Sequence, residues 1–189
     1  KLAHGLRVAA CQISGALPLM KISDYLTFLA EVILQAVLEI AWQAMVDKHG
    51  LPSVDMDLDK PDKREDETLE GSRHFIIVGY GKLGGIELGP ASDLDLVFIH
   101  DVDSQAETLA GENQKAITHS VFFTRLGQKI IHILTAQTIS GALYEVDMRL
   151  RPSGASGLLV SGFDAFKRYQ EESAWTWEHQ ALVRARAVA

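Results

Sequence analysis

The chain has 189 residues, of which 47% are hydrophobic and 23% are charged, as in a folded globular domain and unlike a disordered or fibrous protein. Its 18 basic and 25 acidic residues give a net charge of −7, which argues against general attraction to nucleic acid or an anionic membrane and leaves only a local basic groove open. The single Cys11 cannot form an internal disulfide, and no uncharged apolar run reaches the roughly eighteen residues of a membrane span. We therefore expect a cytoplasmic protein with neither nucleic acid nor membrane as a partner.

The first fifty residues predict two helices that pack on a later core. Apolar residues at helical spacing predict a short helix over residues 2–13. Ser23 is expected to cap a longer helix that ends in a basic turn before Gly50. Residues 51–73 are acidic and lack an apolar period, so we expect a mobile linker and not a metal site.

Short apolar runs predict the strands of the core. Residues 75–78 form a run that stops at a glycine, and residues 94–99 form a second run. A third run over residues 142–151 alternates apolar and polar side chains, as a strand with one wet face does. Apolar spacing predicts a helix over residues 113–138, between the second and third strands.

The end of the chain predicts a short strand followed by more helix. A glycine-rich stretch leads to the apolar residues 158–160, and two helical segments follow from Phe163. The chain starts without Met and stops within an apolar pattern, so we expect a piece of a longer protein.

The segment GYGKLGG, residues 79–85, follows the first strand and matches the dinucleotide-binding pattern G-x-G-x-x-G. Asp101 even stands where that fold has its ribose-binding acid. Only residues 86–92 separate the glycines from the second strand, whereas a parallel crossover needs at least about ten to twelve residues. We expect the two strands to be neighbours joined by a short excursion and not a βαβ unit, and a nicotinamide-binding module stays as a remote alternative.

The same segment also fails as a Walker loop, because Leu83 follows Lys82 where Ser or Thr is required. What remains is a glycine-rich turn whose backbone N–H groups suit a phosphate. A structural turn without a ligand is the alternative interpretation of these residues taken alone.

Two acidic residues come shortly after this turn in the sequence, at the predicted second strand. Asp93 and Asp95 are two residues apart on the predicted second strand, so they share a face and repel each other unless a divalent cation lies between them. Asp147 on the third strand is the candidate for a third ligand, with an ion pair to an arginine as the alternative. Three carboxylates beside a phosphate-binding turn suit two-metal phosphoryl or nucleotidyl transfer. Arg149 and Arg151 share the face of Asp147 and are candidates to neutralise a polyphosphate or, alternatively, to hold a structural network.

Three separated blocks resemble the glutamine synthetase adenylyltransferase family: GYGKLGGIELGPASDLDL (79–96), YEVDMRLRPSG (144–154) and WTWEHQALVRAR (175–186). The resemblance implies an α+β fold like that of DNA polymerase β, a mixed sheet flanked by helices with helical N- and C-terminal segments. It places the nucleotidyltransferase core at residues 74–162 and the start of a helical region at 163–189. The three aspartates are implied as ligands of two Mg²⁺ ions, and the residues implied around the nucleotide are Gly81, Lys82, Gly84, Gly85 and Ser92.

The resemblance also implies a reaction and its partners. ATP is the implied substrate, a tyrosine of glutamine synthetase attacks its α-phosphorus, and Asp147 orients or deprotonates that tyrosine. A PII-type nitrogen-signal protein is the implied regulator of the full-length enzyme. Tyr80, Gly89, Ser153 and the WEHQ run at 177–180 resemble the half that attaches AMP. The half that removes AMP by phosphorolysis is the alternative, and a docking domain with vestigial acids is a third interpretation.

Overall fold

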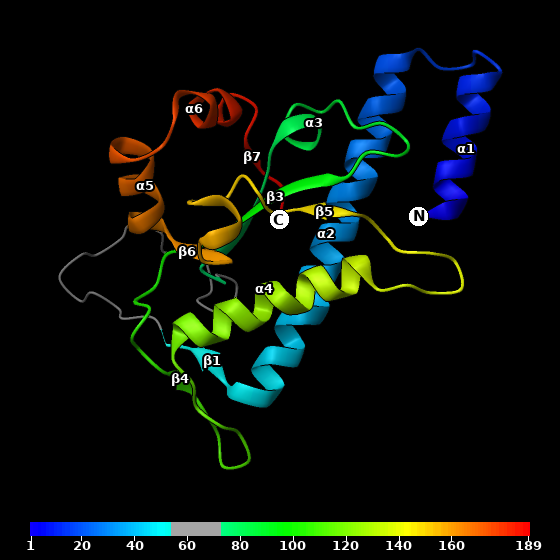
Figure 1. Ribbon diagram of the computed structural model, residues 1–189. Helices are drawn as coiled ribbons and strands as arrows, with labels where there is room; N and C mark the ends of the chain where they lie inside the picture. Colours follow the sequence, from blue (N-terminus) through cyan, green and yellow to red (C-terminus); the bar gives the residue numbers. More distant parts are fainter. Residues whose placement is uncertain (54–72) are drawn as a thin grey trace, which may run out of the picture.

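The computed structural model describes residues 1–53 and 73–189 (Figure 1). Helix α1 spans Leu2–Ile13, as predicted, and α2 spans Leu19–His49 and ends at Gly50. The predicted cap at Ser23 is wrong, because α2 starts earlier with Pro18 at its N-cap. The Pro18 carbonyl accepts the N–H groups of Lys21 and Ile22, so the first turn already forms ahead of the serine.

Helix α2 has 31 residues, and by length and composition alone it is apolar enough to cross a membrane, with a mean hydropathy of 1.5 over an 18-residue window. Within the described protein, 44% of that window is buried. The buried face, which includes Ala30, Leu34 and Ala41, lies in the main hydrophobic core. A core helix with one buried face meets the same criterion.

The sheet is mixed. Strands β2 (Phe75–Gly79) and β3 (Leu94–His100) are antiparallel neighbours, with Ile77 opposite Phe98. This confirms the expected short connection and is incompatible with the parallel crossover of a nicotinamide-binding turn. The strand order is β5-β3-β2-β7, where β5 is Val146–Asp147 and β7 is Arg186–Ala187. Strand β6 (Val160–Gly162) runs parallel to the end of β3, as β5 does to its beginning.

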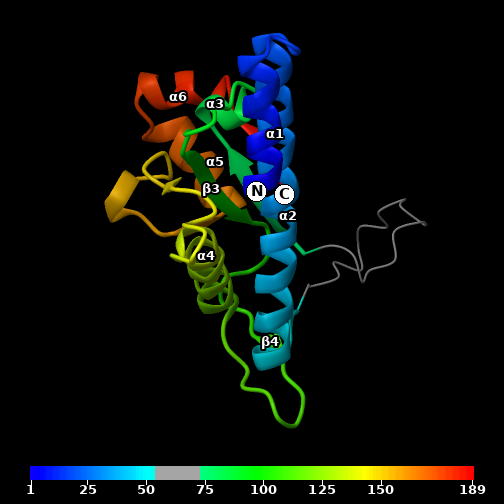
Figure 2. The ribbon, with the colours of Figure 1, turned by 90° about the vertical axis from the view of Figure 1, so that its right-hand side faces the viewer.

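Helices cover both faces of the sheet, which confirms the predicted α+β class (Figures 1 and 2). On one face, Leu96 and Phe98 pack in the core formed with α2 and α4 (His119–Thr135). On the other face, Val97 and Ile99 pack with Tyr80 against α5 (Phe163–Glu172) and α6 (Thr176–Leu182). Figure 2 shows α2 and α6 on opposite sides of β3.

Helix α4 begins at His119, so the predicted start near residue 113 is wrong. Strand β4 (Thr108–Leu109) pairs with β1 (Leu51–Pro52), and the Thr108 N–H donates to the Ile117 carbonyl. The residues before α4 are therefore held in extended and turn conformations by β4. Of the expected linker, Leu51–Pro52 forms β1, and residues 54–72 lie outside the described residues.

The third predicted strand is also shorter than expected, because only Val146–Asp147 of residues 142–151 pairs as β5. The Asp147 carboxylate accepts the backbone N–H of Arg149 at 2.8 Å, and the Met148 carbonyl accepts the N–H of Arg151. An aspartate that bonds to the backbone two residues later favours a turn over a sheet ladder. Residues 148–157 therefore form a loop, which contains the 3₁₀ turn Gly154–Ser156.

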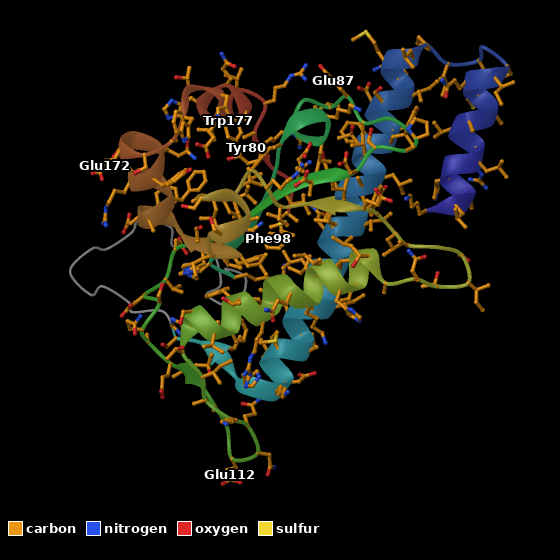
Figure 3. All side chains as sticks on the ribbon, viewed as in Figure 1. Tyr80, Glu87, Phe98, Glu112, Glu172 and Trp177 are labelled. Carbon is orange, nitrogen blue, oxygen red and sulfur yellow. The ribbon has the colours of Figure 1, made fainter. Side chains whose placement is uncertain are left out.

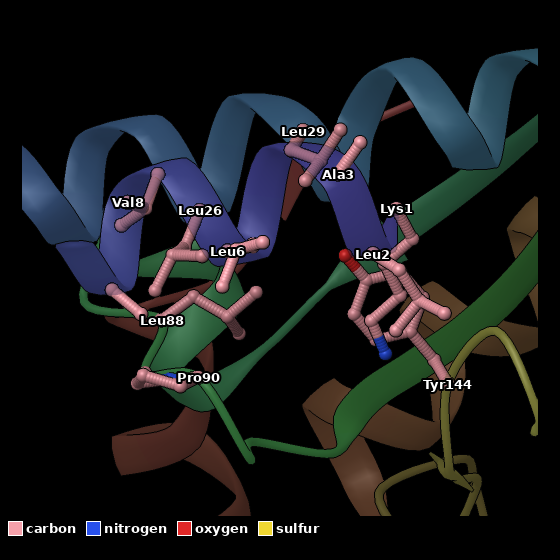
Figure 4. Close-up of a pocket in the computed structure, with 13 residues that line it drawn as sticks. Lys1, Leu2, Ala3, Leu6, Val8, Leu26, Leu29, Leu88, Pro90 and Tyr144 are labelled. Carbon is pink, nitrogen blue, oxygen red and sulfur yellow. The ribbon is translucent and has the colours of Figure 1, made fainter.

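An apolar groove of about 590 Å³ lies between α1, α2 and residues 88–90 (Figure 4). Its walls include Leu6 of α1, Leu26 of α2, Leu88 and Tyr144. Among the described residues that line it there is no carboxylate, so the groove is distinct from the acidic site described next.

Candidate active site

The structure brings the three predicted acids together. The parallel register places Asp95 of β3 directly beside Asp147 of β5, and Asp93 lies two residues earlier. One carboxylate oxygen from each acid lies within 4.8 Å of the others. Side chains that face each other across neighbouring strands point to the same side of a sheet, so the acids share the face that α5 and α6 cover further along β3.

The surroundings of Asp95 disfavour its charge. Burial is the largest cause that raises the pKa of Asp95, and the negative charges of Asp93 and Asp147 add to it. Arg149 and Lys82 act in the opposite direction with smaller effect. Positive charge placed among the three carboxylates would relieve this repulsion.

The pKa of Asp147 is shifted in the opposite direction to that of Asp95. Its carboxylate accepts a hydrogen bond at 2.7 Å from Nε of Arg149 and a second from the Nη2 atom of the same guanidinium. This side-chain bond is the main cause that lowers the pKa of Asp147. The side chain of Arg149 is 81% exposed, so its attachment to Asp147 is exchangeable. The ion pair that the sequence left open is therefore present, and it coexists with the cluster of acids.

The glycine turn contacts both the side chain and the backbone of Asp95. Gly81, the first residue of α3 (Gly81–Gly84), has φ +55°, and a Cβ there would lie 2.5 Å from Oδ2 of Asp95. The N–H of Tyr80 donates to the Asp95 carbonyl at 2.9 Å. The positive φ favours glycine at residue 81, and a side chain there would have to displace the Asp95 carboxylate.

Three backbone N–H groups at the start of α3, those of Gly81, Lys82 and Leu83, have no hydrogen-bond acceptor among the described residues. The later amides are used inside the turn, where Gly84 donates to Tyr80 and Gly85 to Gly81. The turn therefore offers a group of free donors beside Asp95, which is the arrangement that suits phosphate oxygens.

The remaining predicted residues have local contacts. Lys82 is exposed, and its charge acts on Asp95. Oγ of Ser92 accepts the N–H of Gly89 at 3.0 Å and closes the turn before β3. Arg151 donates to the carbonyls of Met148, Ala155 and Gly157. In the structure, then, Ser92 and Arg151 shape the loops that carry the acids.

Tyr80 lies between α6 and the sheet (Figure 3). Burial, aided by the charge of Glu178, raises the pKa of Tyr80 to about 12. Its phenol is therefore protonated at neutral pH and packs as part of the turn.

Sequence reasoning assigned no role to Arg186, which contacts the turn from the end of the chain. Its guanidinium donates to the carbonyls of Leu83 and Gly84 and pairs with Glu31 of α2. Arg186 stands within the block at 175–186, where arginine alternates with alanine, but that alternation does not say what the side chain contacts.

The donor set fits divalent cations. Three carboxylates and no soft ligand suit a hard ion such as Mg²⁺, and the repulsion from Asp93 and Asp147 that adds to the effect of burial on the pKa of Asp95 would be relieved by it. We conclude that Asp93, Asp95 and Asp147 are able to hold such an ion.

Comparison with known proteins gives the family. A family model described as glutamate-ammonia ligase adenylyltransferase matches residues 1–189. Proteins named bifunctional glutamine synthetase adenylyltransferase/adenylyl-removing enzyme are 65% identical over 189 residues in Pseudomonas aeruginosa, 58% over 189 in Hahella chejuensis and 53% over 188 in Pasteurella multocida. Each match covers 100% of this chain and 18% of the relative, so the chain spans under a fifth of these proteins. The chain belongs to the glutamate-ammonia ligase adenylyltransferase family.

Proposed function

We propose that this chain is the nucleotidyl-transfer centre of a glutamine synthetase adenylyltransferase and moves AMP from ATP to a tyrosine of glutamine synthetase. The observation that carries the proposal is the convergence of three carboxylates beside a turn with three free N–H groups. Residues 74–162 form the catalytic core in this proposal, with a fold like that of DNA polymerase β, and the flanking helices support it.

The chain's own residues account for most steps of such a transfer. The amides of residues 81–83 bind phosphate oxygens, and the exposed guanidinium of Arg149 is free to leave Asp147 for the pyrophosphate. Asp93, Asp95 and Asp147 would hold Mg²⁺, which would supply positive charge to offset the negative charge of the transferring phosphoryl group. The tyrosyl oxygen forms a new bond to that phosphorus while the bond to the β-phosphate oxygen breaks and pyrophosphate leaves.

Asp147 is proposed to orient the attacking hydroxyl. Its lowered pKa makes it a weak base while Arg149 is bound, so accepting a hydrogen bond suits it better than removing the proton. When Arg149 moves to the pyrophosphate, it frees an Asp147 carboxylate oxygen to bond to the attacking hydroxyl, whose proton passes to that oxygen as the new bond to phosphorus forms.

The direction of the reaction is the finer part of the proposal. The relatives are named for both attaching and removing AMP. Tyr80, Gly89, Ser153 and the WEHQ run at 177–180 support the attaching half, by their resemblance to it. Removal of AMP by phosphorolysis is the alternative, because both reactions use the same carboxylates. Regulation by a PII-type protein is proposed only for the full-length polypeptide.

The test uses the polypeptide that carries this region, incubated with purified glutamine synthetase. We expect Mg-ATP to add the mass of AMP to glutamine synthetase, read by intact mass spectrometry. Loss of AMP from adenylylated glutamine synthetase with phosphate, and no gain with Mg-ATP, would assign the removing half. Binding of glutamine synthetase without either change would favour a docking domain and overturn the catalytic proposal.

A further inference from the structure

The glycine turn is held at its C-terminal side by a residue about a hundred positions later in the chain. Nε of Arg186 donates to the Gly84 carbonyl at 3.4 Å, and Nη2 donates to the Leu83 carbonyl at 3.3 Å. These two carbonyls belong to the last residues of α3, whose first residues carry the free N–H groups. One guanidinium therefore bonds to both carbonyls at the C-terminal end of α3.

Glu31 fixes the guanidinium from the other side. It lies on α2 and pairs with Nη2 of Arg186, and the two side chains are only 19% and 34% exposed. A half-buried ion pair is screened less by water than an exposed one, so Glu31 restricts the directions in which Arg186 can point. Helix α2 and the glycine turn are thus linked through one arginine.

The backbone of the same segment also touches the turn. Strand β7 pairs Arg186 with Gly79 and Ala187 with Val78 of β2, the strand that enters the turn. A Cβ on Gly84 would lie 1.7 Å from the Arg184 carbonyl, so the two backbones are in direct contact. Residues 184–187 therefore form a fixed support under the turn.

We propose that Arg186, oriented by Glu31, is a positioning residue that holds the free N–H groups of residues 81–83 at the place where the ATP phosphates bind. This inference rests on the proposed function. Arg186 acts through the turn and touches no phosphate, so its loss weakens the binding of nucleotide and leaves the cation site of the three aspartates unchanged.

The test compares Arg186→Gln with Arg184→Gln in the polypeptide that carries this region. Arg184 is the control: its side chain also pairs with the turn, at Glu87, but both partners are 51% exposed, and an ion pair this exposed contributes little to holding the backbone. We expect Arg186→Gln to raise the Kd of Mg-ATP about tenfold, the effect of losing one hydrogen bond from a charged group. Affinity for Mn²⁺ alone, measured by calorimetry, and the Kd of Mg-ATP for Arg184→Gln should remain those of the wild type.

Glu31→Gln leaves residue 186 as arginine and therefore provides a milder variant, should Arg186→Gln unfold. It should raise the Kd of Mg-ATP by a smaller factor than Arg186→Gln does. The Kd of the double variant should equal that of Arg186→Gln alone, because the two residues act as one unit. Additive effects, or equal Kd values for Arg186→Gln and Arg184→Gln, would overturn the positioning role.

Hydrogen exchange separates failure of this inference from failure of the proposed function. The amides of Gly84, Gly85 and Glu87 donate within the turn, so they should exchange faster in Arg186→Gln than in Arg184→Gln, with or without nucleotide. A wild-type protein that does not bind Mg-ATP would end the proposed function, and unchanged exchange at these amides would end the positioning role.

Discussion

The two segments that flank the acids are stabilised in different ways. The glycine turn, residues 79–87, depends on distant parts of the chain, namely the Asp95 carbonyl, the Arg184 carbonyl and the Arg186 guanidinium. The loop over residues 148–157 depends mainly on itself, because Arg151 donates to three carbonyls within it. The first segment is therefore held by long-range contacts, whereas the second is held by contacts within itself.

This difference suits the two tasks proposed for them. A group of amides that binds phosphate must be pre-positioned to favour the transition state, and long-range contacts provide that. The loop carries Arg149, whose exposed side chain exchanges partners between Asp147 and the nucleotide in the proposed reaction. Substitutions in the turn should consequently disturb both fold and activity, and substitutions in the loop should separate the two.

Gly84→Ala tests the turn and has the largest expected effect. Its Cβ would lie 1.7 Å from the Arg184 carbonyl and 2.5 Å from the Gly79 carbonyl, so backbone must move. We expect a loss of roughly 1–3 kcal/mol or more in the free energy of unfolding, as for other overpacked sites, together with loss of AMP transfer. Urea unfolding and the mass assay measure the two effects.

Gly111→Ala is the matched control, because its Cβ would contact only the Gln114 side chain, at 3.5 Å. It should leave transfer intact. Equal behaviour of the two alanine variants would show that the close backbone contact at Gly84 does not matter.

Asp95→Asn tests the acid that lies against the turn. Transfer should fall on the order of 10²-fold or more, as for other groups that stabilise charge in a transition state. Because the folded-state pKa of Asp95 is raised, the folded protein binds this proton more tightly than the unfolded chain, and the charged carboxylate destabilises the fold at neutral pH. Metal-free Asp95→Asn should therefore melt at a higher temperature than the wild type at pH 7, and the gain should vanish as the pH falls to about 4.

Asp147→Asn should change the melting temperature at pH 7 in the opposite direction. Its pKa is lowered in the folded state, so its charge stabilises the fold above the ordinary carboxyl pKa, and this contribution is lost as the pH falls below about 4. We expect the metal-free variant to melt lower than the wild type at pH 7. Shifts of the same sign for both variants would contradict the different surroundings of the two acids.

The two arginines of the loop have the smallest expected effects. Arg151→Gln removes three bonds to backbone carbonyls and should cost about 1–2 kcal/mol in the free energy of unfolding with little change in the KM for ATP. Arg149→Gln should lower the melting temperature only slightly at pH 7, because it removes the exposed bond that lowers the pKa of Asp147, and it should raise the KM several-fold. Thermal melts and initial rates separate them, and a larger KM effect for Arg151 would assign the phosphate contact to that residue.

Local patterns predicted the parts of the fold that depend on local physics. Helix α1, the end of α2 at Gly50 and the adjacency of β2 and β3 followed from apolar period, glycine and connection length. The predicted strand over residues 142–151 was too long, because alternation alone does not show that the Asp147 side chain captures the Arg149 amide. The start of α4 was wrong for a similar reason, since the pairing of β4 with β1 holds the preceding residues.

The convergence of the three acids was predicted on the condition that the third strand lies beside the second, and the structure meets that condition. Their binding of Mg²⁺ and the contacts of Lys82, Ser92 and Arg151 with a nucleotide stay predictions. The support of the turn by Arg186 and Glu31 was not predictable, because it joins α2, the turn and β7 across most of the chain. No local spacing encodes such a contact.

The brevity of β5 constrains how related chains can change in length. The Tyr144 N–H donates to the Leu134 carbonyl, and the Leu94 N–H donates to the Glu145 carbonyl, so the backbone is tethered on both sides just ahead of Asp147. An inserted or deleted residue inside that tether would turn the carboxylate to the opposite face. We therefore expect insertions and deletions among family members to occur within residues 136–142, where the chain can lengthen without reversing Asp147.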